Sequence, residues 1–336
     1  MSSVTSEQLA VITSDQVAAL PPTAFASFSP AQVAVIPPSA MAGMGPQQLA
    51  AMPAIAFALF SPAQMGALPP TAFPGFSAGQ FGQLSPTAMA GMTQEQMTQI
   101  PPQAMSVLNA MQMAAMPSAA FSGLKANQVD ALPTAAFASM NPMQLASMTP
   151  TAVGSLNSDQ VNAMPPAAFA GFNSTQIAAM PPAAMTGMNS MQMAAMPPAA
   201  FAGFNSTQIA AMSASAMAGM SAAQVAAIQP DTIAALSGPQ VAAILPPAIR
   251  GLKGNQVSAM SVAAVAALTK GQIGDFSEEA IDGVTSIQRQ VLTSQQVGAF
   301  TRTVLSITQT NTSVNNGKHT WEIKAPTTNK IQEKFN

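Results

Sequence analysis

Ser29-Pro-Ala-Gln-Val-Ala-Val-Ile36 and Pro37-Pro-Ser-Ala-Met-Ala-Gly-Met44 are consecutive octapeptides, and together they carry the pattern that decides the fold. The same two kinds of octapeptide alternate from Thr5 to Phe300, where 37 of them follow one another without an insertion or deletion. The full repeat is therefore 16 residues long. Repetition at a short fixed period is typical of solenoids, in which each unit packs only on its neighbours.

Each octapeptide carries two large apolar residues, at its positions 5 and 8. Position 5 is apolar in every octapeptide except the one that holds Arg289, and position 8 is apolar throughout. Residues three positions apart lie on one side of a helix. The pattern predicts an all-α fold in which every octapeptide buries one side.

The first kind of octapeptide, here called Gln-type, carries the signals of a helix start. Position 1 is usually Ser, Thr or Asn, position 2 is often Pro and position 4 is Gln, as in Ser61-Pro-Ala-Gln64. A capping residue followed three positions later by Gln is a capping box, and Pro suits the first helical position. Gln recurs in this way from Gln16 to Gln288. This row of glutamines predicts helix caps or a Gln–Gln hydrogen-bond ladder; the alternative is a row that binds the backbone of a peptide.

The second kind, here called Ala-type, has Ala at position 4, often begins with Pro-Pro, and frequently has Gly at position 7, as at Gly43. Proline keeps the residue before it out of the α conformation, so helices of about six residues are expected, too short to be stable alone. Glycine permits a left-handed helix end or a close approach of two backbones. Two unlike corners predict one superhelical turn per 16-residue repeat, with other numbers of octapeptides per turn as the alternative.

The two ends of the array break the alternation. Gln8 precedes Gln16, and Gln296 follows Gln288, so the first and last octapeptides are predicted to be caps. After a short lead at 1–4, the solenoid is expected to cover 5–300.

From residue 301 the sequence changes to β-favouring residues, and Asn315-Asn-Gly317 is a hairpin signal. A hairpin over 301–325 is predicted to cover the end of the solenoid, with a loose tail at 326–336. The alternatives are that these strands begin a further domain or pair with a neighbouring subunit.

The composition is unusual in its lack of charge. Charged residues make up 7% of the chain, and the net charge is −2. No basic stripe is present, which argues against a nucleic-acid partner. No apolar run is long enough to span a membrane, and residues 1–20 do not have the pattern of a signal peptide. A surface with so little charge predicts shielding by sugar, lateral packing or assembly.

Three asparagines stand in glycosylation motifs, which would be used only in a secreted chain. They are Asn173, Asn205 and Asn311. The first two also occupy position 1 of Gln-type octapeptides, where Asn is a good helix cap.

The remaining candidate residues give no catalytic or metal site. Methionine pairs such as Met41 and Met44 have a spacing that could bind Cu(I), but they fill positions 5 and 8 and are predicted to be core. His319 and Trp321, the only His and the only Trp, have no nucleophile and base around them. We expect no enzyme activity, cofactor or metal.

The octapeptides resemble the Leu-Thr-x-x-Gln-Val-x-x-Leu type of short helical repeat that occurs in large surface or secreted proteins of bacteria and amoeboid organisms. The resemblance covers the repeat region and implies an extended rod at a cell surface. The residues themselves predict an extracellular structural or adhesive rod that associates with itself, or with a surface protein or glycan. In end-to-end assembly, Trp321 and His319 of one molecule would meet Thr5 and Gln8 of the next. The second hypothesis is a peptide- or protein-binding solenoid that uses the glutamine row or a concave face.

Overall fold

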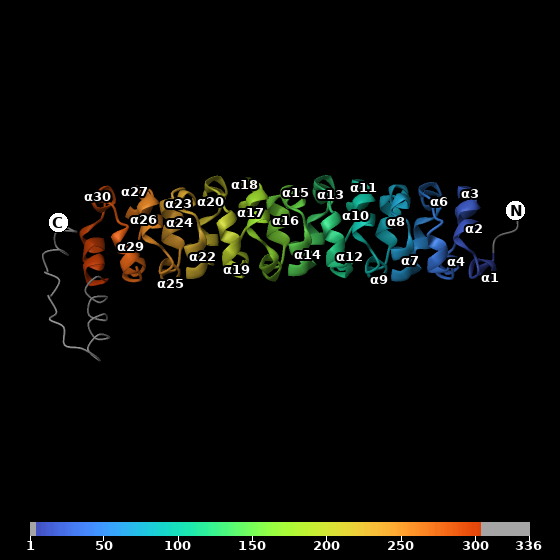
Figure 1. Cartoon of the computed structure of the whole chain (residues 1–336), viewed down its shortest axis with the longest axis horizontal. Coiled ribbons are helices and arrows are strands. Elements are labelled where there is room, and N and C mark those ends of the chain that lie inside the picture. Colours follow the sequence, from blue (N-terminus) through green and yellow to red (C-terminus); the bar gives the residue numbers. More distant parts are fainter. Residues whose placement is uncertain (1–4, 304–336) are drawn as a thin grey trace, which may run out of the picture. The chain divides into compact units, whose positions relative to one another are not determined.

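The structure is a computed structural model that describes residues 5–303, and all its regular elements are short helices (Figure 1). They form two stacks, the N-terminal stack up to Gly187 and the C-terminal stack from Met188 onward. No described helix has the length and apolar character needed to cross a membrane.

The Gln-type octapeptides, together with the first octapeptide, form α-helices of four to six residues. In the N-terminal stack these are α1 (Ser6–Leu9), α2 (Ser14–Ala19), α4 (Pro30–Ala34), α6 (Pro46–Ala51), α7 (Pro62–Ala67), α8 (Ala78–Gln83), α10 (Gln94–Gln99), α12 (Ala110–Ala115), α13 (Ala126–Ala131), α14 (Pro142–Ser147), α16 (Ser158–Ala163) and α17 (Ser174–Ala179). In the C-terminal stack they are α19 (Ser190–Ala195), α20 (Ser206–Ala211), α22 (Ala222–Ala227), α24 (Gly238–Ala243), α26 (Gly254–Ala259), α28 (Lys270–Gly274) and α30 (Ser286–Arg289).

The Ala-type octapeptides form either short α-helices or 3₁₀-helices. The α-helices are α3 (Pro22–Phe25), α5 (Pro38–Met41), α9 (Pro86–Met89), α11 (Pro102–Met105), α15 (Pro150–Val153), α18 (Pro182–Met185), α21 (Ala214–Met217), α23 (Pro230–Ile233), α25 (Pro246–Ile249), α27 (Val262–Ala266) and α29 (Glu278–Asp282). The 3₁₀-helices are η1 (Ala54–Leu59), η2 (Pro70–Gly75), η3 (Ser118–Gly123), η4 (Thr134–Ser139), η5 (Pro166–Gly171) and η6 (Pro198–Gly203).

The predicted helix caps are confirmed. In α14, Asn141 Oδ1 accepts from the backbone N–H of Gln144 at 3.0 Å, and Gln144 Oε1 accepts from the N–H of Asn141 at 3.1 Å. This helix ends at Met148, whose backbone is extended (φ −65°, ψ 137°), so the chain turns there after six helical residues. α14 therefore begins and ends where the sequence indicates, whereas many Ala-type α-helices are shorter than the predicted six residues.

The number of octapeptides per superhelical turn differs from the prediction. Helices that pack on one another are third neighbours along the array; α12, for example, packs on η4, which belongs to the third octapeptide after it. Hydrogen bonds from Gln144 reach still farther back, to residues 28 and 31 positions earlier. One turn therefore takes between three and four octapeptides, and the predicted turn of two octapeptides is wrong. Because third neighbours are of opposite kinds, Gln-type and Ala-type helices alternate along each side of a stack.

Glycine at position 7 serves the close approach of successive turns. A Cβ on Gly91 would lie 1.9 Å from the carbonyl oxygen of Pro62, and one on Gly43 would lie 1.9 Å from that of Ser14. Neither glycine has a positive φ, so the close backbone contact is confirmed and the left-handed helix end is not. Where serine replaces this glycine, its hydroxyl binds the equivalent carbonyl: Ser155 Oγ donates to Ala126 O at 3.1 Å.

The core consists of the apolar residues at positions 5 and 8 of both kinds of octapeptide and the small residue at position 4 of the Ala-type octapeptides. All six 3₁₀-helices hold Phe at position 5, as at Phe169. The only Ala-type octapeptide with Phe that is α-helical holds Phe25, and it lies in the first turn, where no earlier turn packs on it. Packing between turns, rather than local sequence alone, thus favours the tighter helix.

The predicted strands at 301–325 begin in a segment that is helical in part. The last described helix runs from 294 to 303, so the first three residues of the predicted hairpin are helical. Thr301 Oγ1 and Thr303 Oγ1 bind the carbonyls of Val297 and Ala299, four residues earlier, which allows threonine to continue a helix. The rest of the predicted hairpin and tail lies outside the described residues.

Candidate functional site

The glutamine at position 4 is the most highly connected side chain of the repeat. Gln144 Nε2 donates to the carbonyls of Met113 at 2.8 Å and Met116 at 3.0 Å, which lie in the octapeptide four before its own. Its Oε1 meanwhile caps its own helix at Asn141. One side chain thus closes the start of one helix and the end of another, one turn earlier. We call this arrangement the glutamine clamp.

The clamp repeats in both stacks with nearly constant geometry. Where both bonds are present, Nε2 lies 2.6–3.3 Å from the carbonyl oxygens of positions 5 and 8 of the Gln-type octapeptide four units earlier. The glutamines from Gln48 onward are buried, with at most 6% of their surface exposed. Buried amides must be hydrogen-bonded, and the clamp satisfies both N–H groups of each amide.

This burial answers two of the expectations for the glutamine row. The amides bind backbone carbonyls of the preceding turn, so the predicted Gln–Gln ladder is wrong for the clamps described above. A row that is buried also offers no surface to a peptide. The capping role, by contrast, is confirmed.

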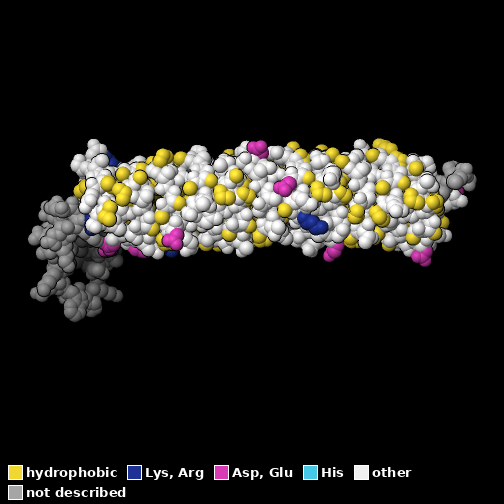
Figure 2. Space-filling model, turned by 90° about the horizontal axis from the view of Figure 1, so that it is seen from above, with side chains coloured by type: hydrophobic (Ala, Val, Ile, Leu, Met, Phe, Trp, Pro, Cys, Tyr) yellow, Lys and Arg dark blue, Asp and Glu magenta, His cyan; other side chains and the backbone are white. Residues whose placement is uncertain are grey.

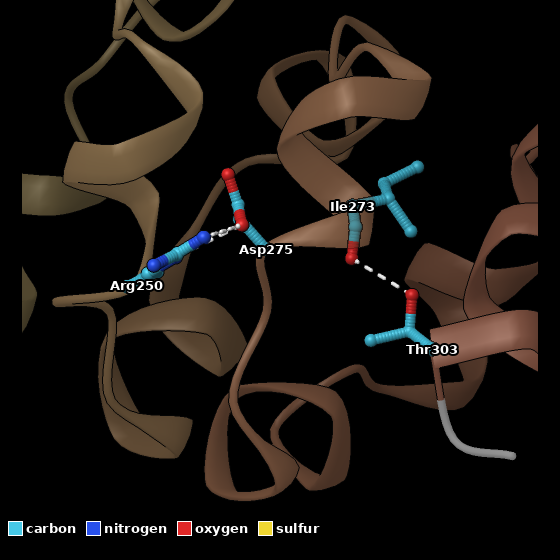
Figure 3. A network of polar contacts seen from close by, with 4 residues as sticks. All are labelled: Arg250, Ile273, Asp275 and Thr303. Carbon is cyan, nitrogen blue, oxygen red and sulfur yellow. Dashed lines mark hydrogen bonds and ion pairs between the residues drawn. The ribbon is translucent and has the colours of Figure 1, made fainter. Parts of the chain in front are cut away.

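Threonine performs part of the same task at two places in the C-terminal stack. Thr232 is the only residue other than Ala at position 4 of an Ala-type octapeptide, and its Oγ1 donates to Phe204 O at 2.9 Å. At the end of the array, the one hydroxyl proton of Thr303 is shared between Ala299 O at 3.0 Å and Ile273 O at 3.3 Å (Figure 3), and the latter is a carbonyl that a glutamine would bind elsewhere. Gln296, the predicted cap, is itself a clamp, with Nε2 2.8 Å from Leu268 O.

At the start of the N-terminal stack, the residue at position 4 is exposed or half-buried, whereas in later turns it is buried. Position 4 is exposed at Gln8 and Gln16 and half-buried at Ala24 and Gln32, whereas from Ala40 onward it is buried throughout this stack. Four octapeptides therefore lack a preceding turn. Thr5 and Gln8, the predicted assembly residues, form a capping box, with Thr5 N–H 3.0 Å from Gln8 Oε1. Their assembly role stays a prediction.

The two described glycosylation motifs lie at exposed helix caps. Asn173 Oδ1 accepts from the N–H of Gln176 at 2.9 Å, and Asn205 Oδ1 accepts from that of Gln208 at 3.0 Å. A glycan would be attached through Nδ2, which the cap does not use. The geometry therefore accommodates sugar without loss of the cap. Asn311, His319 and Trp321 lie outside the described residues.

No protein-family model matches this chain, and no curated protein matches it. The resemblance to Leu-Thr-x-x-Gln-Val-x-x-Leu repeats therefore stays a prediction.

Reactive groups are sparse over the described residues. The methionine pair Met41 and Met44 is buried in the core, as predicted. Within 5–303, no three His, Cys, Asp or Glu side chains come together as metal ligands would. Figure 2 shows few charged side chains on a surface made mainly of hydrophobic side chains and other uncharged groups.

An ion pair joins two described residues of the C-terminal stack, Arg250 and Asp275. Arg250 Nη2 lies 2.6 Å from Asp275 Oδ1 (Figure 3), and the two residues belong to third-neighbour octapeptides. The arginine side chain is mostly exposed, and an exposed pair of this kind contributes little to stability. The pair joins neighbouring turns of the stack.

Proposed function

We propose that this chain is a non-enzymatic structural subunit: an extracellular or cell-surface rod that serves as a stalk, spacer or fibre element and associates with further copies of itself. The glutamine clamp carries the proposal. In the clamp, the glutamine at position 4 joins each turn to the turn before it.

The surface supports the same function. A soluble monomer normally relies on mixed surface charge to stay apart from its neighbours. Here the exposed positions are filled mainly by Ala, Ser, Thr, Pro and Gly, which suits packing against another surface or coverage by sugar. Exposed asparagine caps at Asn173 and Asn205 fit coverage by glycans.

The alternative function, peptide binding along the glutamine row, has lost its basis because the row is buried from Gln48 onward. A binding solenoid that uses a concave face is not favoured by any specific contact among the described residues.

Electron microscopy of the protein from its natural source, together with its mass, tests the proposal. A structural polymer should appear as uniform fibres, with subunit mass above the 34.1 kDa of the chain if sugars are attached. Single particles that stay monomeric at all concentrations and bind a soluble peptide would contradict it.

A further inference from the structure

One row of the N-terminal stack carries a stripe of exposed aliphatic side chains. Helices α1, α4, η1, α8 and α11 pack on one another in that order, each three octapeptides from the next. The position-7 residues that go with these five helices are Val11, Val35, Leu59, Gln83 and Val107. The four aliphatic side chains are between 39% and 77% exposed.

The stripe is confined to this row. In the two other rows of the N-terminal stack, position 7 holds only Gly, Ala, Ser or Gln. On α8, where position 7 is Gln83, Gly82 lies beside Val107, because a Cβ on Gly82 would lie 3.5 Å from Cγ2 of Val107. Ile55 is a further exposed aliphatic residue of η1, with 55% of its surface exposed. At position 7, one row holds four large aliphatic residues and the two other rows hold small or polar ones, while the exposed large residues of those rows, Met111 and Met143, stand singly. A row of exposed aliphatic residues indicates a surface that another surface covers.

The net charges of different parts of the chain indicate which segment covers the stripe. Residues 1–187 carry five acidic side chains and one lysine, a net charge of −4, whereas 304–336 carry four lysines and two glutamates, a net charge of +2. The C-terminal segment also contains large apolar residues, among them Leu305, Ile307, Trp321 and Ile323. Another N-terminal stack would bring like charge to the stripe, but the C-terminal segment brings opposite charge and apolar side chains.

We propose that the stripe formed by Val11, Val35, Leu59 and Val107 binds residues 304–336 of a second copy of the chain. This inference rests on the proposed function, because such docking joins one structural subunit to the next. In this proposal the C-terminal segment binds along the side of the first turns, whereas in the end-to-end assembly it would meet Thr5 and Gln8.

The full-length chain offers a direct readout, since Trp321 is its only tryptophan and lies in the docking segment. Sedimentation velocity and tryptophan emission are measured together over a range of protein concentrations. The wild type should associate as concentration rises, with a blue shift of the emission over the same range. Added salt should weaken both effects, because the charges that attract the segment are screened.

The decisive variant replaces Val35, Leu59 and Val107 by Ser. Truncation of a central contact costs roughly tenfold in affinity, so the triple variant should associate about 100-fold or more weakly than the wild type. Met111→Ser with Met143→Ser is the matched control. Both methionines are large, at least 65% exposed and in the same stack, but they belong to the two other rows, so this variant should behave as wild type. Far-ultraviolet circular dichroism checks that both variants fold.

Three results would overturn the proposal. If the wild type associates and the triple variant associates equally well, the stripe is not the docking surface, while the proposed assembly stands. If emission is blue-shifted in monomers at every concentration, the segment folds on its own chain. If the wild type neither associates nor shifts, self-assembly itself is refuted.

Discussion

Gln144 accepts a hydrogen bond from its own helix start and donates two to the end of a helix one turn earlier. A glutamine that only caps a helix would not need to be buried. Removal of the amide would leave Met116 O without a donor, whereas Met113 O would keep the backbone N–H of Met116. The residue therefore links local capping to the stacking of turns.

Gln144→Ala should lower the free energy of unfolding by about 3 kcal/mol, since it leaves the carbonyl of Met116 without a donor and removes half of a capping box. Gln16 is the matched control, because it caps its helix in the same way but no earlier turn precedes it. Gln16→Ala should cost about 1 kcal/mol or less. Urea unfolding followed by circular dichroism measures both, and equal losses would show that the clamp to the earlier turn adds nothing.

Gly91 marks one of the close contacts of backbone with backbone. Gly91→Ala would place a Cβ 1.9 Å from Pro62 O, so the turns must separate, and stability should fall by about 1–3 kcal/mol. Gly274 has no atom within 4 Å of the equivalent Cβ position, and Gly274→Ala should be neutral or stabilising by up to about 1 kcal/mol. Thermal unfolding compares the two; a harmless Gly91→Ala would contradict the tight approach.

Methionine exposure predicts an order of oxidation. Met111, Met143 and Met191 are 65–68% exposed, whereas Met113 and Met193 are buried. Dilute hydrogen peroxide should convert the first three to sulfoxide before the buried ones react. Peptide mapping by mass spectrometry at short times gives the order, and early oxidation of Met113 would mean that the stack opens.

At the scale of the helix, four to six residues form too few hydrogen bonds to be stable alone. A peptide covering 109–140, four octapeptides long, has no preceding turn for its glutamines to clamp. It should show little helical circular dichroism, and fragments with further turns should gain helix steeply. If a peptide of this length were fully helical, the short helices would be stable without packing between turns, which would contradict the account.

The sequence predicted the helices well because their signals are local. Asn141 and Gln144 stand three positions apart, and proline at 142 suits the first helical position, so cap and start are written within one octapeptide. The length of the turn is not local, because Gln144 reaches Met113 across four octapeptides. The choice of 3₁₀-helix at Phe169 likewise depends on packing between turns, as the α-helical exception at Phe25 indicates.

At the scale of the whole molecule, the regular repeat bears on the proposed structural function. A catalytic site needs a few unlike residues at singular places, whereas this chain uses the same residues again in each turn. The candidate assembly surfaces lie where the structure departs from the regular repeat. One is the first turn, which has no preceding turn, and the other is the row with large residues at position 7. The stripe could have been found in the sequence only with the number of octapeptides per turn in hand, because its members are three octapeptides apart or a multiple of that.

Turns that contain between three and four octapeptides underlie both the clamp and the stripe, and engineered disulfides test them directly, since the chain has no cysteine of its own. A Cβ on Gly79 would lie 3.9 Å from Cβ of Ala54, within the range for a disulfide. The pair Ala54→Cys with Gly79→Cys should cross-link rapidly under mild oxidation, while Gly79→Cys with Glu95→Cys, at the same position two octapeptides apart, should stay reduced. Rapid closure of the second pair and not the first would restore the turn of two octapeptides and contradict the structure.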